Sequence, residues 1–410
     1  MASEHLRDAR VIFGARIIRL FSYGFLSIAL FLYLSARGFS DQSIGLLLTL
    51  TLLGDAGISL LLTTHADRAG RKRTLLIGAA LMIAAGIIFA STENYILLVL
   101  AGIIGVLSPS GNEIGPFLSV EQAALAQLIQ DTNRTRILAW YNLVGSFATA
   151  VGAFAGGALA QFLQNHGWSA LDSYRAVIFG YALLGGVLFA LFLLLTPAVE
   201  IMRAPLADAT NVLFGLTHSR NIVFQLATLF ALDAFAGGFV VQSIVAYWFN
   251  VKFGLEPATL GAIFFGANLL AGISALSAAR IAARIGLINT MVFTHLPSNI
   301  LLILVPLMPT AWLAVTMLLI RFSISQMDVP TRQSYTLAVV QPNERSAASG
   351  VTTIARSLGA SVAPALAGQM LALPLLFSAP FFLAGGLKIV YDLLLWRKFS
   401  ALKPPEERAA

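Results

Sequence analysis

Long apolar stretches recur along almost the whole chain, and they restrict its fold more than any other feature does. Hydropathy predicts about twelve of them, starting near residues 11, 43, 74, 95, 138, 174, 222, 257, 288, 310, 347 and 373. Each approaches the roughly 20 residues that a helix needs to cross the hydrocarbon core of a bilayer. Because 58% of the residues are hydrophobic and only 11% are charged, one water-soluble core cannot bury them all. The sequence therefore predicts an all-α integral membrane protein with about twelve transmembrane helices.

Several function classes are excluded by what the sequence lacks. None of its hydrophilic stretches reaches the size of a domain, so the net charge of +7 does not indicate a nucleic-acid-binding module. No Ser-His-Asp spacing, Walker-type phosphate loop or cluster of metal ligands is present. The chain has no cysteine, which excludes disulfides and thiolate chemistry. We therefore expect no enzyme, no cofactor, no metal site and no nucleic acid as a partner.

Basic residues gather in alternate connecting segments, which indicates how the chain lies in a membrane. If the amino terminus is cytoplasmic, the outward loops keep only Arg37, Arg175 and Lys252, and the inward segments hold many more. This asymmetry follows the positive-inside rule. No small-residue cleavage site follows the first apolar run, so we expect a retained helix and no signal peptide. The expected location is the plasma membrane (bacterial inner membrane), with multiple passes and both termini cytoplasmic.

The chain resembles itself when it is shifted by about 211 to 216 residues. Residues 19–25 then align with 233–239, and residues 66–70 with 282–286. Glu121 and its neighbour likewise align with Arg332 and its neighbour. Each match is weak, but all occur in the same order and orientation. We expect two pseudo-symmetric six-helix bundles, 1–196 and 222–410, joined by a cytoplasmic linker at 197–221, with one site between the bundles.

A basic turn at residues 67–73 separates the second and third apolar runs. It resembles the signature of the major facilitator superfamily, in which Asp and a basic residue precede Gly and two more basic residues. The matching positions are Asp67, Arg68, Gly70, Arg71 and Lys72. Thr63 stands where the family has an opening glycine, and Ala283 replaces the aspartate in the second-half copy. The resemblance covers essentially the whole length of the chain and implies the superfamily's fold and its alternating-access transport.

The resemblance also implies a latch on the cytoplasmic side. In the family, the aspartate of the turn meets helix 11 of the other half, which assigns this role to Asp67. An arginine of the turn reaches an acidic residue near the inner end of helix 4, and Glu121 occupies that position. The alternative is that Arg71, Lys72 and Arg73 only orient the chain by binding anionic headgroups.

Charges inside the spans carry most of the expected mechanism, because each costs roughly 2.5 to 3.5 kcal/mol at a helix centre unless it is paired or hydrated. The repeat places Arg19 and Asp233 at equivalent positions of helices 1 and 7. We expect them to form a gate that closes in one conformation and opens in the other. The open alternative is a fixed bridge between Arg19 and Asp55, which would hold one half together.

Four embedded carboxylates are candidates for the proton carrier of such a transporter. A carboxylate in a low-dielectric medium can load and release a proton near neutral pH. The candidates are Asp55, Glu113, Asp233 and Asp328. Pro109 and Pro116 flank Glu113 and predict a kinked helix 4. A structural ion pair is the alternative for each, and Asp328 is four residues from Arg332, where the two can neutralise each other.

Candidate lining residues of the substrate cavity are polar or aromatic groups that can hold an organic solute. They are Tyr23, Asn142, Gln242, Gln326 and Arg356. Lys388 and Asp392 are four apart in helix 12, which lies outside the cavity in this family, so we leave them out of the site. His295 has no neighbours that suggest metal binding.

The expected function is secondary active transport of a small organic solute, by proton-coupled efflux. The glycines Gly145, Gly152, Gly156 and Gly157 in helix 5 resemble those of drug-efflux exporters, although the accompanying proline is missing. One alternative is a proton-coupled or facilitative importer of a small polar metabolite, with an anion subsite such as Arg19 with Arg356. A transport-dead receptor on the same fold is a further alternative. Expected partners are the solute, protons and membrane lipid, and the expected carrier is a monomer.

Overall fold

The computed structural model describes residues 2–113, 115–128, 131–200, 216, 218–341, 344–402, 404 and 407. Every regular element in these residues is a helix, which confirms the all-α prediction. Most of the predicted linker at 197–221 lies outside the described residues. The chain forms two compact units, and one segment of its second half belongs to the first unit. One unit is Met1–Pro205 with Val241–Asn268, and the other is Leu206–Val240 with Leu269–Ala410.

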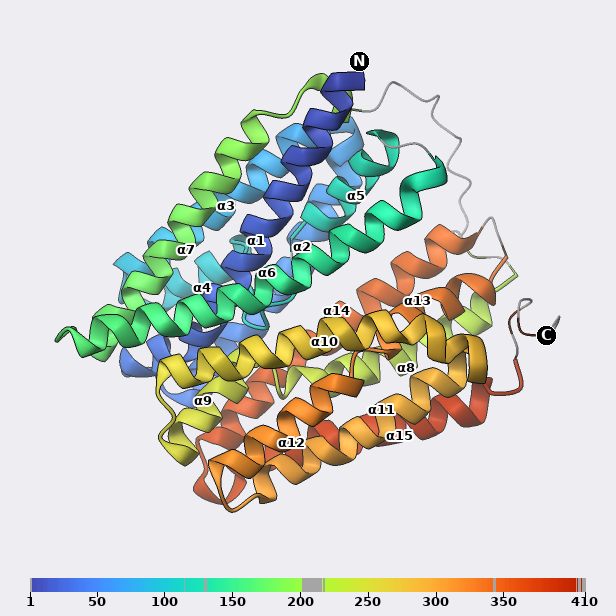
Figure 1. Cartoon of the computed structure of the whole chain (residues 1–410). Coiled ribbons are helices and arrows are strands. Elements are labelled where there is room, and N and C mark those ends of the chain that lie inside the picture. Colours follow the sequence, from blue (N-terminus) through green and yellow to red (C-terminus); the bar gives the residue numbers. More distant parts are fainter. Residues whose placement is uncertain are drawn as a thin grey trace. The chain divides into compact units, whose positions relative to one another are not determined.

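Helices of the first half of the chain make up most of the first unit (Figure 1). They are α1 (Ala2–Ala36), α2 (Asp41–Ala69), α3 (Arg71–Ser91), α4 (Tyr95–Ile104), α5 (Phe117–Leu128), α6 (Asp131–Asn165) and α7 (Ala170–Leu193), followed by the short 3-10 helix η1 (Pro197–Val199). This unit also contains α9 (Gln242–Phe253) and the first part of α10 (Pro257–Ile285).

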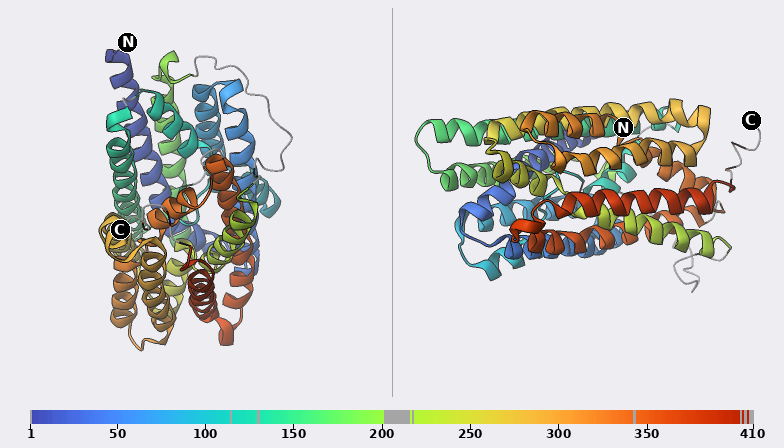
Figure 2. Two further views of the ribbon diagram at one scale, coloured as in Figure 1. Left: turned by 90° about the vertical axis from the view of Figure 1, so that its right-hand side faces the viewer. Right: turned by 90° about the horizontal axis from the view of Figure 1, so that it is seen from below.

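The second unit begins with α8 (Arg220–Gly238) and continues with the rest of α10. It then contains α11 (Leu287–Leu304), α12 (Ala311–Ile324), α13 (Asp328–Ala338), α14 (Arg345–Leu371) and α15 (Ala379–Phe399), with short 3-10 helices η3 (Val305–Leu307) and η5 (Pro374–Leu376). Within this unit, α8 packs against α14 and α15, and α11 packs along α15 (Figure 2).

Ten segments of the described chain are helical, long and apolar enough to cross a membrane. They coincide with ten of the predicted spans. The fourth predicted span is divided between α4 and α5, and the eleventh is α14, which carries Arg356 and Pro364. The fourth is interrupted between α4 and α5, whereas α14 is a continuous helix that is not apolar enough to be among the ten.

Glycines set the closest helix contacts in the first unit. Helix α1 lies along α6, and a methyl group added to Gly152 of α6 would collide with the backbone carbonyl of Phe21. The same holds for Gly24 of α1 against Thr149 of α6. Small residues of this kind let backbones approach closely where lipid removes the hydrophobic drive for helix association. The glycine-rich sequence of helix 5 therefore has a packing role against α1.

Apolar side chains fill the second unit. Leu226 and Phe230 of α8 pack with Met291 of α11, Tyr335 of α13 and Tyr391 of α15, all nearly or completely buried. This cluster borders the buried charges described below, since the guanidinium carbon of Arg332 lies 5.5 Å from the ring centroid of Phe230. It supplies the low-dielectric wall that makes each of those charges expensive unless it is paired.

Helix 4 is broken rather than kinked. Helix α4 ends at Ile104 and α5 begins at Phe117, and the described residues between them are not helical. Pro109 and Pro116 lack the N–H that a continuous helix needs, while Gly111 has φ 70° and Gly115 has φ 77°. Ser108 Oγ donates to the carbonyl of Asn112 at 2.8 Å. Such backbone is tolerated at membrane depth when protein covers it.

Candidate functional site

One cluster of charges, the Arg19 cluster, joins α1 to the break, to α5 and to α6. It consists of Arg16, Arg19, Glu113, Glu121 and Tyr141. Arg19 donates to both carboxylate oxygens of Glu121, at 2.5 Å and 3.0 Å. Its Nη2 also lies 3.0 Å from Glu113 Oε1, and Arg16 pairs with the other oxygen of Glu113. Tyr141 donates to Glu121.

This cluster is balanced and closed. Two arginines face two glutamates, and the side chains of Arg19 and Glu121 are both 0% exposed. A bidentate arginine–carboxylate pair is the strongest form of such a contact, and it offsets part of the cost of removing both charges from water. The Arg19 cluster therefore fixes α1 against α5.

The structure corrects two expected partners in this unit. Glu121 is completely buried, and its partners among the described residues are Arg19 and Tyr141, where the resemblance implied an arginine of the basic turn. The alternative bridge from Arg19 to Asp55 does not form either. Asp55 instead accepts hydrogen bonds from the N–H of Gly115 at 2.7 Å and from Ser59 at 3.3 Å. The break brings Gly115 to α2, which the sequence pattern could not show.

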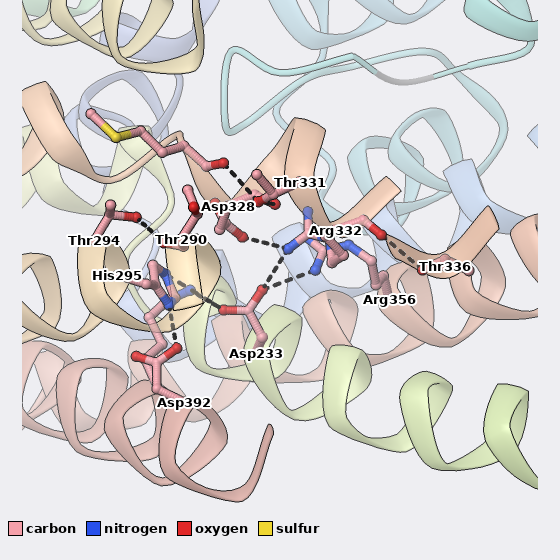
Figure 3. A network of polar contacts seen from close by, with 12 residues as sticks. Asp233, Thr290, Thr294, His295, Asp328, Thr331, Arg332, Thr336, Arg356 and Asp392 are labelled. Atoms are coloured by element: carbon pink, nitrogen blue, oxygen red, sulfur yellow. Dashed lines mark hydrogen bonds and ion pairs between the residues drawn. The ribbon is translucent and has the colours of Figure 1, made fainter. Parts of the chain in front are cut away.

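A second cluster, the Asp233 cluster, lies in the other unit (Figure 3). Asp233 of α8 accepts from Lys388 of α15 at 2.5 Å, from Arg356 of α14 at 2.9 Å and from Arg332 of α13 at 3.4 Å. Arg332 also donates to Asp328 at 2.6 Å, which confirms the predicted pair one helical turn apart. Asp233 is the common partner of three cations from three helices.

The cluster continues to α11. His295 Nδ1 lies 2.9 Å from Asp392 Oδ1, and Asn299 donates to the other oxygen of Asp392 at 2.9 Å. His295 Nε2 is 4.0 Å from Asp233. A chain of polar contacts thus connects Asp392 through His295 to Asp233 (Figure 3). No group in the described residues is arranged to hold a metal ion.

Lys388 and Asp392 belong to the Asp233 cluster, contrary to the prediction that they lie outside the site. Their four-residue spacing suggested a mutual pair on an outer helix. Lys388 reaches Asp233 and Asp392 reaches His295, because α15 packs against both α8 and α11. The sequence feature that could have indicated this is the presence of two charges in one apolar span, since charges inside spans are rare and are usually paired.

The two clusters are related by the internal repeat with their signs exchanged. The sequence shift aligns Arg19 with Asp233 and Glu121 with Arg332. The structure pairs Arg19 with Glu121 in one unit and Asp233 with Arg332 in the other. Each expected gate residue is therefore partnered within its own unit. The repeat keeps the ion pair while reversing which helix carries the cation.

Arg321 of α12 has a different position. It lies over the ring of Phe322, with 5.0 Å between the guanidinium carbon and the ring centroid. It is within electrostatic range of Asp233 and Asp328. No carboxylate of the described residues is within ion-pair distance of it. Its Nε is buried without a hydrogen-bond partner in this part of the chain.

The basic turn is held by Glu200, which the sequence did not single out. Gly70 has φ 100°, a value that disfavours other residues, and it separates α2 from α3. Glu200 accepts the N–H groups of Arg71 at 2.7 Å and Lys72 at 3.1 Å, so it caps α3. The side chains of Asp67 and Arg68 lie outside the described part of the structure. The expected contact of Asp67 with helix 11 therefore stays a prediction.

The second half repeats this cap. Gly286 has φ 85° and separates α10 from α11, and Glu407 accepts the N–H of Leu287 at 2.6 Å. The motif has lost its aspartate at Ala283, but the glycine turn and the acidic cap remain. The cap residues come from the segments that follow each half, so they lie far along the sequence from the turns that they cap.

The five cavity candidates have unequal surroundings. Tyr23 is completely buried, and Gln242 donates to Ser27 of α1 at 2.8 Å while accepting from Asn268 at 3.2 Å. These contacts give Gln242 a structural role between α1, α9 and α10. Asn142 is exposed, and Gln326 is partly buried. The side chain of Arg356 is 32% exposed although it contacts Asp233.

Comparison with known proteins agrees with these features. Residues 12–364 match the family model of the Major Facilitator Superfamily. The uncharacterized membrane protein YJR124C of Saccharomyces cerevisiae is 30% identical over 418 residues, covering 95% of this chain and 93% of the relative.

Solved transporter structures resemble the fold. A variant of the nucleoside transporter NupG has a TM-score of 0.77 at 13% identity, covering 95% of this chain and 99% of that one. The D-xylose-proton symporter has a TM-score of 0.72 at 15% identity, covering 95% and 97%. The basic turn, the repeat, the helical fold and the family match lead to one conclusion: this chain belongs to the Major Facilitator Superfamily.

Proposed function

We propose that this protein moves a small organic solute across a membrane by alternating access and couples the movement to protons. Membership of the superfamily supports transport. The internal repeat supports alternating access, because two related bundles can rock about a shared site. The similar structures are those of a nucleoside transporter and a D-xylose-proton symporter, so the fold alone does not select a solute.

The surroundings of Asp55 carry the proposal of proton coupling. Glu113, Asp233 and Asp328 each lie within ion-pair distance of an arginine. Asp55 meets only neutral donors within the described residues. A carboxylate in a membrane span without a cation is costly in its charged form, so binding a proton relieves that cost. Asp55 is therefore the best candidate of the four.

Protonation of Asp55 can act on the break in helix 4. The N–H of Gly115 donates to the carboxylate, and a protonated carboxyl accepts this bond less strongly. Glu113 is two residues away and holds both Arg16 and Arg19 of α1. A proton on Asp55 therefore loosens α2 from the break, and the break transmits the change to α1.

The proposed direction is efflux in exchange for protons. The glycine-rich α6, which resembles the corresponding helix of drug-efflux exporters, supports it. The distribution of arginine and lysine supports a plasma-membrane orientation with both termini cytoplasmic. Import of a small polar metabolite, with or without protons, is the second candidate. The structural likeness to a D-xylose-proton symporter favours it.

Reconstitution in liposomes with a trapped pH-sensitive dye tests the proposal. Sugars, nucleosides, organic anions and organic cations are added in turn, and proton flux is recorded together with movement of labelled solute. We expect at least one solute to drive proton flux. In Asp55→Asn, we expect solute exchange to continue while solute-driven proton flux is lost, because the amide cannot load a proton.

Asp172→Asn is the matched control, since Asp172 pairs with Arg175 at an exposed helix start. It should leave proton flux unchanged. Unchanged proton flux in Asp55→Asn contradicts the assignment of the carrier. Solute movement without proton flux in the unaltered protein reduces the function to facilitated diffusion. Accumulation of the solute driven by an inward-directed proton gradient identifies a proton-coupled importer.

A further inference from the structure

The charges of the Asp233 cluster and its neighbour Arg321 do not balance. Three carboxylates are present, Asp233, Asp328 and Asp392. Four permanent cations surround them, Arg321, Arg332, Arg356 and Lys388. Counting these carboxylates and cations alone, one positive charge is left over in a membrane span, where an unpaired charge is costly. Such an excess needs a counterion.

The contacts show which cations are already satisfied. Arg332 bridges Asp328 and Asp233, and Lys388 binds Asp233, with both side chains at most 10% exposed. Asp392 is occupied by His295 and Asn299. Arg332, Lys388 and Asp392 are thus already paired within the cluster, so we do not expect them to bind a ligand.

Arg356 and Arg321 are the open members. The side chain of Arg356 is 32% exposed, and its contact with Asp233 uses Nη1. Arg321 has no carboxylate partner in the described residues. Both are close enough to Asp233 to share its field, one by direct contact and one at longer range. Arginine forks are suited to bind carboxylate, sulfonate or phosphate groups.

The first unit gives the contrast. Its Arg19 cluster has two arginines and two glutamates, and Arg19 is completely buried. Arg19 therefore cannot serve in the anion subsite that the sequence suggested for Arg19 with Arg356. The excess cation occurs on one side of the repeat only.

We propose that Arg321 and Arg356 form the subsite for the anionic group of the transported solute, which is therefore a small organic anion. This inference rests on the proposed transport function and narrows its substrate class. One negative charge on the solute neutralises the excess cation. Asp233 holds the guanidinium of Arg356 in place and prevents it from turning away when the site is empty.

The test uses the full-length protein, purified and reconstituted, with matched sets of solutes. Each set shares a carbon skeleton and differs in one group: a carboxylate, sulfonate or phosphate ester against its amide, alcohol and amine. Thermal unfolding in detergent reports binding, and exchange of labelled solute reports transport. We expect stabilisation and exchange by members of the anionic series only.

The variants are Arg321→Gln and Arg356→Gln. Each should raise the half-saturating concentration of the effective anion by about 10-fold to 100-fold, the usual effect of losing one charge-assisted hydrogen bond. Without any solute, Arg321→Gln should raise the unfolding temperature, because it removes the uncompensated charge. Arg175→Gln, at an exposed ion pair, is the control and should leave anion binding unchanged.

Other outcomes separate this proposal from the general function. Transport of a neutral or cationic solute that both variants retain overturns the anion subsite and leaves transport standing. Stabilisation by phosphatidylglycerol vesicles, but by no soluble anion, assigns the arginines to a lipid headgroup and also overturns it. If no solute crosses at all, the transport function fails and this proposal fails with it.

Discussion

Glu121 shows how one residue can bind two helices together inside a membrane. It is completely buried, accepts two hydrogen bonds from Arg19 and receives a third from Tyr141. A buried pair of this kind contributes little relative to an apolar pair, but removing one member leaves a buried charge uncompensated. The same argument applies to Asp233, on which three cations depend.

Glu121→Gln should therefore lower the free energy of unfolding by about 3 kcal/mol, the usual effect of breaking a buried pair. Arg19 would keep only Glu113 as a charged partner. Chemical or thermal unfolding in detergent measures the change. Glu93→Gln is the control, because Glu93 is 85% exposed and 4.0 Å from Arg37, and it should have almost no effect. Equal stability of Glu121→Gln and the unaltered protein would contradict the role of the pair.

Residue types in the spans were predictable from sequence, but their partners were not. The charged residues that the sequence analysis places inside spans include most members of both clusters, because any charge among apolar residues stands out. Pairing depends on the rotation of each helix and on which helices meet, and neither follows from spacing within one helix. Asp328 with Arg332 is the informative exception, since both lie on one helix one turn apart.

At the scale of elements, acidic caps fasten the helix that follows each glycine turn. Glu200 caps α3 and Glu407 caps α11, each from a segment distant in sequence. A carboxylate at a helix start satisfies free N–H groups and meets the positive end of the helix dipole. The two turns therefore tie α3 and α11 to the segments that leave each half.

Glu200→Ala should destabilise the start of α3 by roughly 1 kcal/mol, as loss of a helix cap does. We expect faster amide hydrogen exchange at residues 71–74, and little change at the start of α11. Glu407→Ala should give the reverse pattern. Exchange that accelerates equally at both helices in both variants would indicate a global loss of stability and not a local cap.

The sequence predicted a kink in helix 4 but not the break between α4 and α5. Two prolines near Glu113 predicted a disturbed helix, and the disturbance is present. Its extent depends on tertiary hydrogen bonds, among them Gly115 to Asp55 and Tyr181 to the carbonyl of Val106. These bonds replace those of a continuous helix. They join residues far apart in the sequence, so the local sequence pattern does not predict them.

At the scale of the whole molecule, the second half of the chain contributes α9 and part of α10 to the first unit. Phe31 of α1 stacks on Tyr247 of α9 with 4.2 Å between ring centroids. The N–H of Ser243 donates to the carbonyl of Pro109 in the break at 3.1 Å. Gly157 of α6 and Gly261 of α10 touch without side chains between them. Alternating access requires contacts of this kind between the repeats to open and close.

Because the chain has no cysteine, the labelling rate of a single introduced thiol reports how accessible α9 is within the first unit. Ser243 is completely buried, so Ser243→Cys should react slowly with a maleimide. Adding Gly157→Leu should force α6 and α10 apart and accelerate labelling several-fold, which mass spectrometry measures.

Ser169→Cys is the control for this experiment, because Ser169 is exposed at the start of α7. It should label quickly with and without Gly157→Leu. If Gly157→Leu leaves the labelling rate of Ser243→Cys unchanged, the contact between α6 and α10 does not control access to α9.

The break in helix 4 also bears on how such a protein can diverge. Its backbone is held by side chains from α2 and α7, so residues within it can change without unravelling α4 or α5. A helix interior offers no such freedom, because each insertion there rotates every following residue. Single-residue insertions in the break therefore leave the rotation of α4 and α5 unchanged, so this segment can vary in length while the remaining scaffold stays intact.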